Sequence, residues 1–225
     1  IPRLLERKEL GHDKARYLCL IQQRLPGENL QTVVKQRLHL NWPETLHILG
    51  QTLQILKALQ GFHPQIMHLD IKPSNLMYVP SAEEAYGTLS LIDFGAARIQ
   101  GQETDAAGGT PGFSPPEQLQ GRPVPASDLY ALGATALELL TGSAAENLYN
   151  GNRLEFWDVL EIPAPYKNWL EIMVHPDASL RFDHAEQALE QLLQTVQTQN
   201  PEWMEALQQQ LLRIPGVLKP TDAQV

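Results

Sequence analysis

A short polar segment near the middle of the chain carries residues whose types and spacing could do phosphate chemistry. Asp70, Lys72 and Asn75 stand close together, and Asp93 follows the apolar run Leu-Ser-Leu-Ile. Carboxylate and amide oxygens are ligands that hard Mg²⁺ prefers, so Asp93 and Asn75 could hold a metal ion that neutralises phosphate oxygens. Asp70 could orient an attacking hydroxyl and accept its proton, and Lys72 could offset charge on the transferred group.

The segments around these residues resemble the catalytic loop and the metal-binding turn of protein kinases. Residues 67–77 read Met-His-Leu-Asp-Ile-Lys-Pro-Ser-Asn-Leu-Met, and residues 92–95 read Ile-Asp-Phe-Gly. The resemblance implies a protein kinase that uses ATP and Mg²⁺, and the order Asp-x-Lys-Pro-x-Asn implies a Ser/Thr acceptor on a protein substrate. On this mapping the catalytic residues are Asp70 and Lys72, the metal ligands are Asn75 and Asp93, and the supporting residues are His68, Leu69, Phe94 and Gly95.

Further along the chain, residues 109–117 (Gly-Thr-Pro-Gly-Phe-Ser-Pro-Pro-Glu) resemble the end of a kinase activation segment, with Pro-Pro-Glu where Ala-Pro-Glu is usual. The resemblance gives Thr110 a structural or regulatory role and implies that Glu117 pairs with Arg181. It also implies that Asp128 holds the backbone of the catalytic loop. An ordinary helix-capping role would explain Asp128 as well, and the two roles can coexist.

The segment 19–30 resembles the strand and hinge of a kinase that receive adenine. On this mapping Gln22 is the gatekeeper, Gln23 and Leu25 present backbone groups to the base, and Met77 is its floor. Alternating apolar residues before a Pro-Gly turn also occur in many edge strands, so a plain edge strand remains the alternative.

The phosphate clamp of the kinase pattern is absent from the sequence. No Gly-x-Gly-x-x-Gly stretch precedes Ile21, and neither Lys8 nor Lys14 lies in the Val-Ala-Ile-Lys context of the ATP-binding lysine. The chain also begins at Ile1 as though within a strand. We therefore expect that the first strands and the first helix of a kinase N-lobe are missing upstream, and that the fragment by itself is inactive.

A second departure concerns regulation. Leu69 stands where many kinases carry an Arg that binds a phosphate on the activation segment. A phosphate on Thr104 would lie between Glu103 and Asp105 and would find no cation at Leu69, so we expect it to be neutral or mildly inhibitory. Arg98 could alter this expectation by folding back onto the phosphate.

Three other readings compete with an active protein kinase. A pseudokinase or scaffolding module would keep the fold but lose ligands, and the missing lysine keeps this reading open. A small-molecule phosphotransferase of the aminoglycoside-kinase type shares the His-x-Asp-x₄-Asn loop but not the segment 110–117. A metal hydrolase that uses His63, His68 and Asp70 has suitable ligand types, but histidines near an apolar helix end are more often core residues.

Composition excludes some classes of partner. The 225 residues carry a net charge of −9, so there is no diffuse basic surface for nucleic acid. No apolar stretch approaches the length of a membrane span. Cys19 is the single cysteine and lies in an apolar run, which fits a reducing cytoplasm.

The secondary structure expected from the sequence is that of an α+β fold that is mainly helical. The resemblance to kinases implies a protein-kinase-like C-lobe with the last strands of a truncated N-lobe. We divide the chain into an N-lobe remnant with the hinge (1–25), the C-lobe (26–198) and a C-terminal helix with a polar tail (199–225). Short strands are expected in the first 25 residues and over 66–96, and 97–125 show no helical period. The leucine spacing and the helix start and stop signals predict helices over 43–62, 126–142, 153–161, 166–174, 184–198 and 202–213. The stretch 109–142 looks most like that of bacterial, particularly cyanobacterial, members of the eukaryotic-like Ser/Thr kinases, and this resemblance implies a role in signalling.

Overall fold

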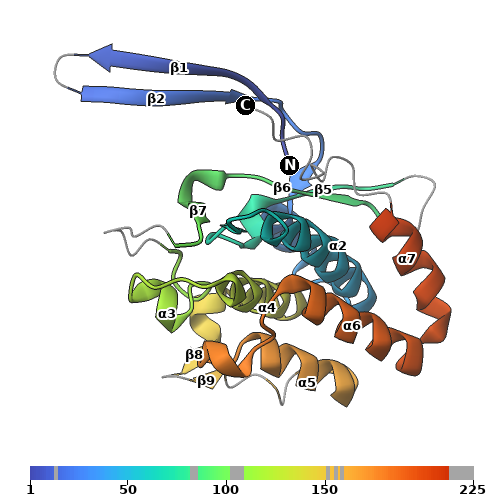
Figure 1. Cartoon of the computed structure of the whole chain (residues 1–225). Helices are drawn as coiled ribbons and strands as arrows, with labels where there is room; N and C mark the ends of the chain where they lie inside the picture. The colour runs from blue at the N-terminus through green and yellow to red at the C-terminus, as the bar shows by residue number, and fades with distance from the viewer. Residues whose placement is uncertain are drawn as a thin grey trace.

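The computed structural model describes residues 1–12, 15–81, 86–101, 109–150, 153–154, 157 and 160–212. A helical body carries a two-stranded hairpin that projects from one end (Figure 1). The main helices are α1 Leu30–Arg37, α2 Trp42–Gln60, α4 Pro125–Thr141, α5 Ala164–Met173, α6 Ala185–Gln199 and α7 Met204–Leu212. The expected α+β class with a mainly helical body is confirmed.

Helix α2 forms where the leucine periodicity predicts it. Its start is fixed by a capping box, in which the Glu44 N–H donates to Asn41 Oδ1 at 2.9 Å and the Asn41 N–H donates to Glu44 Oε2 at 3.1 Å. Its apolar face is fully buried, with Leu46, Leu49 and Leu53 at 0% exposure. This face packs against α4, α6 and α7, so α2 forms one wall of the core.

Helix α4 lies at the centre of the body, between α2 and α5 (Figure 1). Its residues 126–139 are all buried, polar ones included. The Ser127 hydroxyl accepts the Val124 N–H at 3.1 Å in the first turn, and Gly142 follows the last turn with a φ of 69°. A helix buried on all sides gives the polar residues of its first turn a fixed position.

Small antiparallel sheets position the loops that carry the polar residues. Strand β4 Ile66–Met67 pairs with β7 Arg98–Ile99, and β5 Leu76–Val79 lies between β3 Glu28–Asn29 and β6 Thr88–Leu91. The segment 68–75 therefore connects β4 to β5, and the segment 92–97 connects β6 to β7. Both pairs of strands bring these two connections to the same edge of the body.

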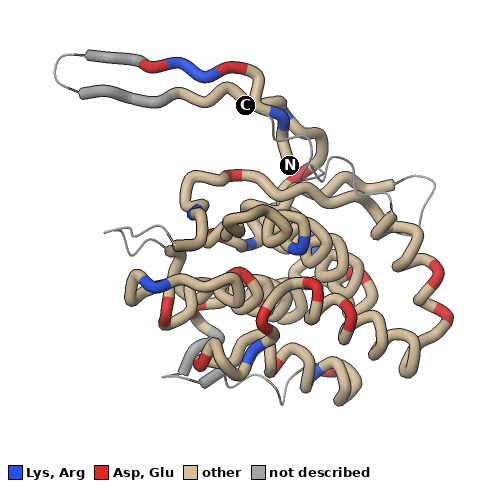
Figure 2. The backbone as a smooth tube through the Cα atoms, viewed as in Figure 1, with Lys and Arg blue, Asp and Glu red and all other residues tan. Residues whose placement is uncertain are grey.

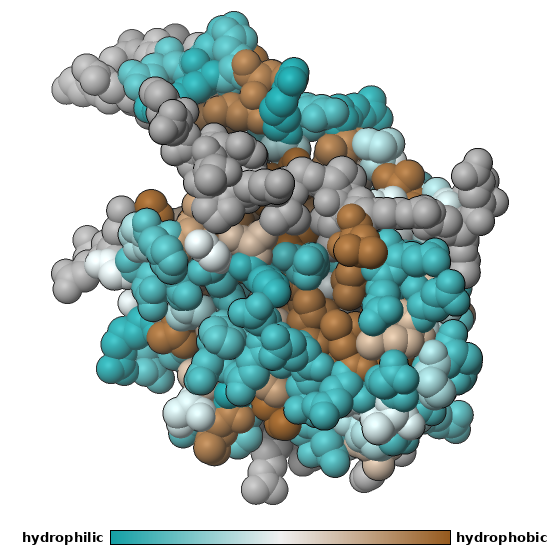
Figure 3. Space-filling model, turned by 45° about the vertical axis from the view of Figure 1, so that its right-hand side comes forward, coloured by the Kyte–Doolittle hydropathy of each residue, from teal (hydrophilic) through white to brown (hydrophobic). Residues whose placement is uncertain are grey.

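Strands β1 Leu4–His12 and β2 Ala15–Gln22 form the projecting hairpin, with Leu4 opposite Gln22 and Lys8 opposite Cys19. Leu4, Leu5 and Leu20 are each about half exposed, at 51%, 53% and 52%. Figure 3 shows hydrophobic atoms on the hairpin above a body whose visible face is mainly hydrophilic. The two strands pair with each other, and no third strand joins their sheet among the described residues.

The structure corrects two expectations of secondary structure. The helix expected over 153–161 is wrong where the structure describes it, because β9 Arg153–Leu154 pairs with β8 Tyr149–Asn150. The segment 97–125 contains a short helix, α3 Pro116–Leu119, which the lack of helical period did not predict. The described structure also includes the 3₁₀ turns η1 Pro73–Asn75, η2 Phe94–Ala96, η3 Ala145–Leu148, η4 Ala178–Leu180 and η5 Pro201–Trp203.

Acidic residues mark the C-terminal part of the surface, where α6 and α7 carry Glu but no Lys or Arg (Figure 2). Within the part of the chain that the structure describes, no helix is both long and apolar enough to cross a membrane.

Candidate active site

The loop that carries Asp70 begins directly after β4, and its backbone is held by helix α4. The two carboxylate oxygens of Asp128 accept the backbone N–H groups of His68 and Leu69, each at 2.7 Å. Asp128 is fully buried, and burial raises its pKa, while the charge of His68 and the two N–H donors act in the opposite direction. Leu69 is held in a left-handed conformation with a φ of 63°, which is unusual for a residue with a branched side chain.

His68 is a buried structural residue of this loop. Its Nε2 lies 3.1 Å from the Ile92 carbonyl, and the Asp70 N–H donates to its Nδ1 at 3.3 Å. Its ring meets the Phe94 ring edge to face at 4.7 Å. Burial lowers the pKa of His68, which favours the neutral ring that these two hydrogen bonds require. Both ring nitrogens are engaged, and this argues against the metal-hydrolase reading of His68.

The side chain of Asp70 is the point at which the polar residues of the loop meet. Its Oδ2 lies 2.8 Å from both Lys72 Nζ and Asn75 Nδ2, and its Oδ1 accepts the Thr110 hydroxyl at 2.7 Å. Lys72 Nζ also donates to the Thr110 hydroxyl, at 2.9 Å. The Asp70 side chain keeps 15% of its surface exposed, so the carboxylate is accessible yet fixed on three sides.

Asn75 and Asp93 lie on the two connections that the sheets bring together. The Ile92 N–H donates to the Asn75 carbonyl at 3.0 Å and so joins the two connections directly. Asn75 uses its Nδ2 on Asp70, which leaves its amide oxygen as the acceptor. Asp93 has a left-handed φ of 63°, and its Oδ1 accepts the Gly95 N–H at 3.2 Å. Among the described residues, no group of three or more His, Cys, Asp or Glu side chains could hold a metal by itself.

A cleft of about 730 Å³ opens between the hairpin end and the body. Its walls include the hinge residues Gln23 and Leu25, with Met77 and Asp93 on the side of the body. The Gln23 N–H is already used, since it donates to the Arg3 carbonyl at 2.8 Å. The structure thus brings the residues expected around adenine into one cleft with one of the expected metal ligands.

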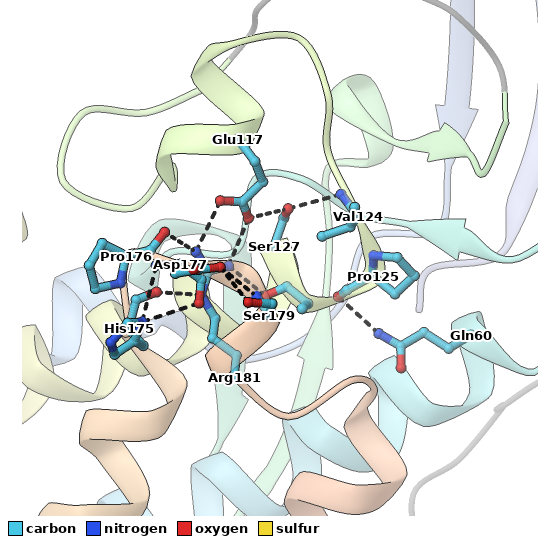
Figure 4. Close-up of polar contacts among 11 residues, drawn as sticks. Gln60, Glu117, Val124, Pro125, Ser127, His175, Pro176, Asp177, Ser179 and Arg181 are labelled. Carbon is cyan, nitrogen blue, oxygen red and sulfur yellow. Dashed lines mark hydrogen bonds and ion pairs between the residues drawn. The ribbon is translucent and has the colours of Figure 1, made fainter.

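Glu117 and Arg181 form a bidentate ion pair at the base of α4 (Figure 4). Arg181 Nη1 lies 2.7 Å from Glu117 Oε1, and Nη2 lies 3.0 Å from Oε2. The other three N–H groups of Arg181 donate to the backbone carbonyls of His175, Ala126 and Pro176 at 2.6 to 3.1 Å. The Arg181 side chain is fully buried, at 0% exposure, and all five of its donors are satisfied.

Two further contacts complete this ion pair. The Ser127 hydroxyl donates to Glu117 Oε1 at 2.7 Å, and the Arg181 guanidinium lies over the Tyr130 ring at 4.9 Å from its centroid. Burial alone would raise the pKa of Glu117, but the hydrogen bonds from Arg181 and Ser127 and the charge of Arg181 outweigh it and hold this pKa below its usual value. The carboxylate is therefore ionised at neutral pH.

The turn before Glu117 is packed directly onto η3. Gly112 has a φ of 83°, and a Cβ at this position would lie 2.4 Å from the Glu146 backbone nitrogen. The backbone of η3 is itself held by Glu138, whose Oε2 accepts the Ala145 N–H at 2.8 Å. We call residues 109–117, which contain this turn and Glu117, the acceptor segment. The turn of the acceptor segment is therefore fixed by packing against the body.

The side chains of other residues singled out in the sequence do not join the polar contacts around Asp70. Leu69 is buried at 6% exposure, and Arg98 donates to its own neighbours, the carbonyls of Ala96 and Ala97. Lys8 is on the exposed hairpin, where it pairs with Glu6 at 3.1 Å. Thr104 lies outside the described residues.

Sequence reasoning missed two side chains that contact these motifs. Ser127 supports Glu117, and Gln118 donates from its Nε2 to the Leu69 carbonyl at 2.7 Å. The only available signal for either residue was its position beside a motif residue. Nothing in the local sequence indicates a contact between Gln118 and a loop 49 positions away.

Comparisons with known proteins agree with this geometry. A family model described as the protein kinase domain matches residues 4–212. Serine/threonine-protein kinase F of Synechocystis sp. is 34% identical over 183 residues, which cover 77% of this chain and 36% of that protein. Serine/threonine-protein kinase B of the same organism is 33% identical over 209 residues, covering 85% and 34%. Serine/threonine-protein kinase PknK of Mycobacterium tuberculosis is 38% identical over 144 residues, covering 61% and 12%. The aligned part of the chain thus spans between 12% and 36% of the length of these relatives.

Proposed function

The chain belongs to the protein kinase domain family, and we propose that the protein transfers the γ-phosphoryl group of ATP to a Ser or Thr hydroxyl of a protein substrate. Relatives in a cyanobacterium and a mycobacterium confirm the resemblance to bacterial Ser/Thr kinases. Because the sequence of residues 1–225 contains no Gly-rich phosphate loop, the proposal concerns the activity of the whole protein. The single cysteine and the use of ATP favour a cytoplasmic reaction.

The arrangement around Thr110 is the observation that carries the proposal. Its hydroxyl donates to Asp70 Oδ1 at 2.7 Å and accepts from Lys72 Nζ at 2.9 Å. An acceptor hydroxyl needs the same two partners, a carboxylate for its proton and a cation near its oxygen. The site therefore already binds a hydroxyl in the manner that transfer to Ser or Thr requires.

In the proposed reaction the acceptor oxygen attacks the γ-phosphorus while its proton moves to Asp70. The bond between the γ-phosphorus and the bridging oxygen breaks, and ADP leaves. Lys72, 2.8 Å from the Asp70 carboxylate, lies where it can offset negative charge on the transferred group. Asn75 holds Asp70 in place through two hydrogen bonds of 2.8 Å from its Nδ2.

The residues present fit a Mg²⁺ ion bound together with a nucleotide. The Asn75 amide oxygen and the Asp93 carboxylate are hard oxygen ligands on adjacent connections, and Mg²⁺ is usually held by one or two protein ligands plus phosphates and waters. Bound there, Mg²⁺ would supply charge neutralisation on the phosphates.

The cleft beside Asp93 is the proposed nucleotide site. Gln23 and Leu25 would offer backbone groups to adenine, and Met77 would pack against its face. Since the Gln23 N–H is bonded to Arg3, the carbonyl of Gln23 is the group that remains for the base. This is consistent with a base that donates from an exocyclic amine.

The test is phosphoryl transfer by the full-length protein. Purified wild-type protein is incubated with γ-labelled ATP, Mg²⁺ and casein as a general acceptor, and phosphoserine and phosphothreonine are measured. We expect activity that Asp93→Ala removes while the protein stays folded, because the change deletes a metal ligand and opens no core cavity.

Glu186→Ala is a suitable control, because this carboxylate forms an exposed ion pair with Lys57, at 2.6 Å. It should leave activity unchanged. Full turnover in Asp93→Ala would refute the metal role of Asp93. A folded wild-type protein that binds ATP without any transfer would favour a pseudokinase.

A further inference from the structure

Gln118 is a buried amide outside the residues assigned to the reaction. It lies on α3 directly after Glu117, and only 3% of it is exposed. Its Nε2 donates to the carbonyl of Leu69 at 2.7 Å. Leu69 immediately precedes Asp70 in the chain, so this hydrogen bond reaches the backbone of the proposed catalytic base.

The peptide group between Leu69 and Asp70 is held at both of its polar atoms. Its carbonyl oxygen accepts from Gln118, and its N–H, which belongs to Asp70, donates to His68 Nδ1 at 3.3 Å. The preceding N–H of Leu69 is fixed by Asp128 at 2.7 Å. Since Leu69 has a left-handed φ of 63°, this conformation persists only where the surroundings enforce it.

The Gln118 amide has little freedom to leave this position. A Cβ on Gly109 would lie 3.2 Å from Gln118 Nε2 and 2.0 Å from the Ser114 hydroxyl, so backbone and side chains are closely packed around it. The backbone of Gln118 is fixed as well, because its N–H donates to the Pro115 carbonyl at 3.1 Å and its neighbour Glu117 is bonded to Arg181.

We propose that Gln118 is a positioning residue. It connects the acceptor segment to the proposed base, Asp70, because it fixes the peptide group between Leu69 and Asp70. The inference rests on the proposed function, because it assigns Asp70 as the base. Gln118 does not touch substrate or nucleotide in this role. It acts through the direction in which the Asp70 carboxylate points, toward Lys72 and the acceptor hydroxyl.

Loss of this hydrogen bond should affect the chemical step more than binding. Without its donor the Leu69 carbonyl is left buried and unsatisfied, and the peptide can relieve this only by rotating. Such a rotation moves Asp70 relative to Lys72, and small displacements of a reacting group lower the rate strongly. The adenine cleft and the Gly112 contact with η3 do not depend on this peptide.

The experiment compares three variants of the full-length protein. Gln118→Met keeps the length of the side chain but removes the donor. Gln118→Glu keeps the shape but places an acceptor oxygen against the Leu69 carbonyl. Gln120→Met is the matched control, because Gln120 lies two positions away, is exposed, and accepts from Arg122 Nη2 at 2.7 Å.

We expect kcat to fall about tenfold in Gln118→Met, equivalent to about 1.4 kcal/mol in the barrier, and further in Gln118→Glu. The KM values for ATP and for the protein acceptor should stay within about twofold of wild type. A residue that only fills space would tolerate Gln118→Met, because the apolar Met side chain has nearly the same length, and kcat of this variant would stay close to wild type. Melting curves ensure that each rate is measured on folded protein.

Hydrogen exchange of the peptide that contains the Asp70 amide supplies a readout independent of activity. Exchange there should accelerate in both Gln118 variants and remain unchanged in Gln120→Met. A wild type without kinase activity would count against the proposed function, while the exchange data would still decide whether Gln118 fixes this loop. Unchanged exchange, or equal losses in kcat and in acceptor binding, would overturn the inference.

Discussion

Replacing Glu117 by Ala should destabilise the protein by about 3–5 kcal/mol, because it leaves a buried guanidinium without its counter-charge. The Arg181 side chain is at 0% exposure, and two of its five donors depend on Glu117. The Ser127 hydroxyl would also lose its acceptor. At about 2–4 °C for each kcal/mol in a chain of this size, the melting temperature should fall by roughly 10 °C.

A double-mutant cycle measures the pair separately from its surroundings. Urea unfolding would be followed by circular dichroism for wild type, Glu117→Ala, Arg181→Leu and the double variant. We expect the double variant to be more stable than the sum of the single changes predicts, by about 2 kcal/mol. Additivity within about 0.5 kcal/mol would mean that the two side chains do not interact. Glu186→Ala removes an exposed ion pair and should cost less than about 1 kcal/mol.

The stabilisation that the Glu117–Arg181 ion pair provides should depend on pH. Because the pKa of Glu117 is held below its usual value of 4.5, the contribution of Glu117 to stability is fully present above pH 4.5 and is lost as the pH falls through the lower pKa of the folded state. The difference in unfolding free energy between wild type and Glu117→Ala should therefore shrink in acid. A difference that grows below pH 4.5 would contradict the direction of the shift.

Three other changes test the site. Asp70→Asn should lower kcat by about 10²–10⁴-fold with little change in ATP affinity, and equal losses in both would count against its role as base. Gly112→Ala should raise the KM for the protein acceptor and cost about 1–3 kcal/mol, because a Cβ would lie 2.4 Å from the Glu146 nitrogen; an unchanged KM would mean that the turn can move freely. Asp128→Asn places an amide N–H against a backbone N–H and should cost at least about 2 kcal/mol in urea unfolding, whereas a neutral effect would show that the loop does not need the carboxylate.

The parts of the fold that could be predicted are those with local signals. Helix α2 has a capping box at Asn41 and Glu44 and a continuous leucine face, and helix α4 ends at Gly142. In both helices the apolar pattern and a start or stop signal in the sequence indicate the same element. The helix expected over 153–161 has a basis in the helical spacing of Leu154, Trp157 and Leu160. The prediction is wrong at residues 153–154, because these residues pair with β8 as strand β9. The Asn150-Gly151 dipeptide is a common hairpin signal and would have indicated this pairing.

The candidate site was predictable to the extent that its residues belong to motifs. Asp70, Lys72 and Asn75 occur in one loop, and the structure joins them at distances of 2.8 Å. Contacts between distant segments were not accessible in the same way. The contacts of Gln118 with Leu69 and of Ser127 with Glu117 form only when α3 and α4 pack in the folded protein. A Gln or a Ser at these positions does not by itself indicate such a contact.

The first turn of α4 anchors two separate structures. Asp128 holds the loop that contains Asp70, and the adjacent Ser127 and the Ala126 carbonyl bind the Glu117–Arg181 pair behind the acceptor segment. The loop that contains Asp70 and the segment that contains Glu117 are thus both held by three consecutive residues of one buried helix, Ala126, Ser127 and Asp128. The relative position of Asp70 and Glu117 is therefore set within the helical body, and a substitution that disturbs the first turn of α4 should displace both residues at once.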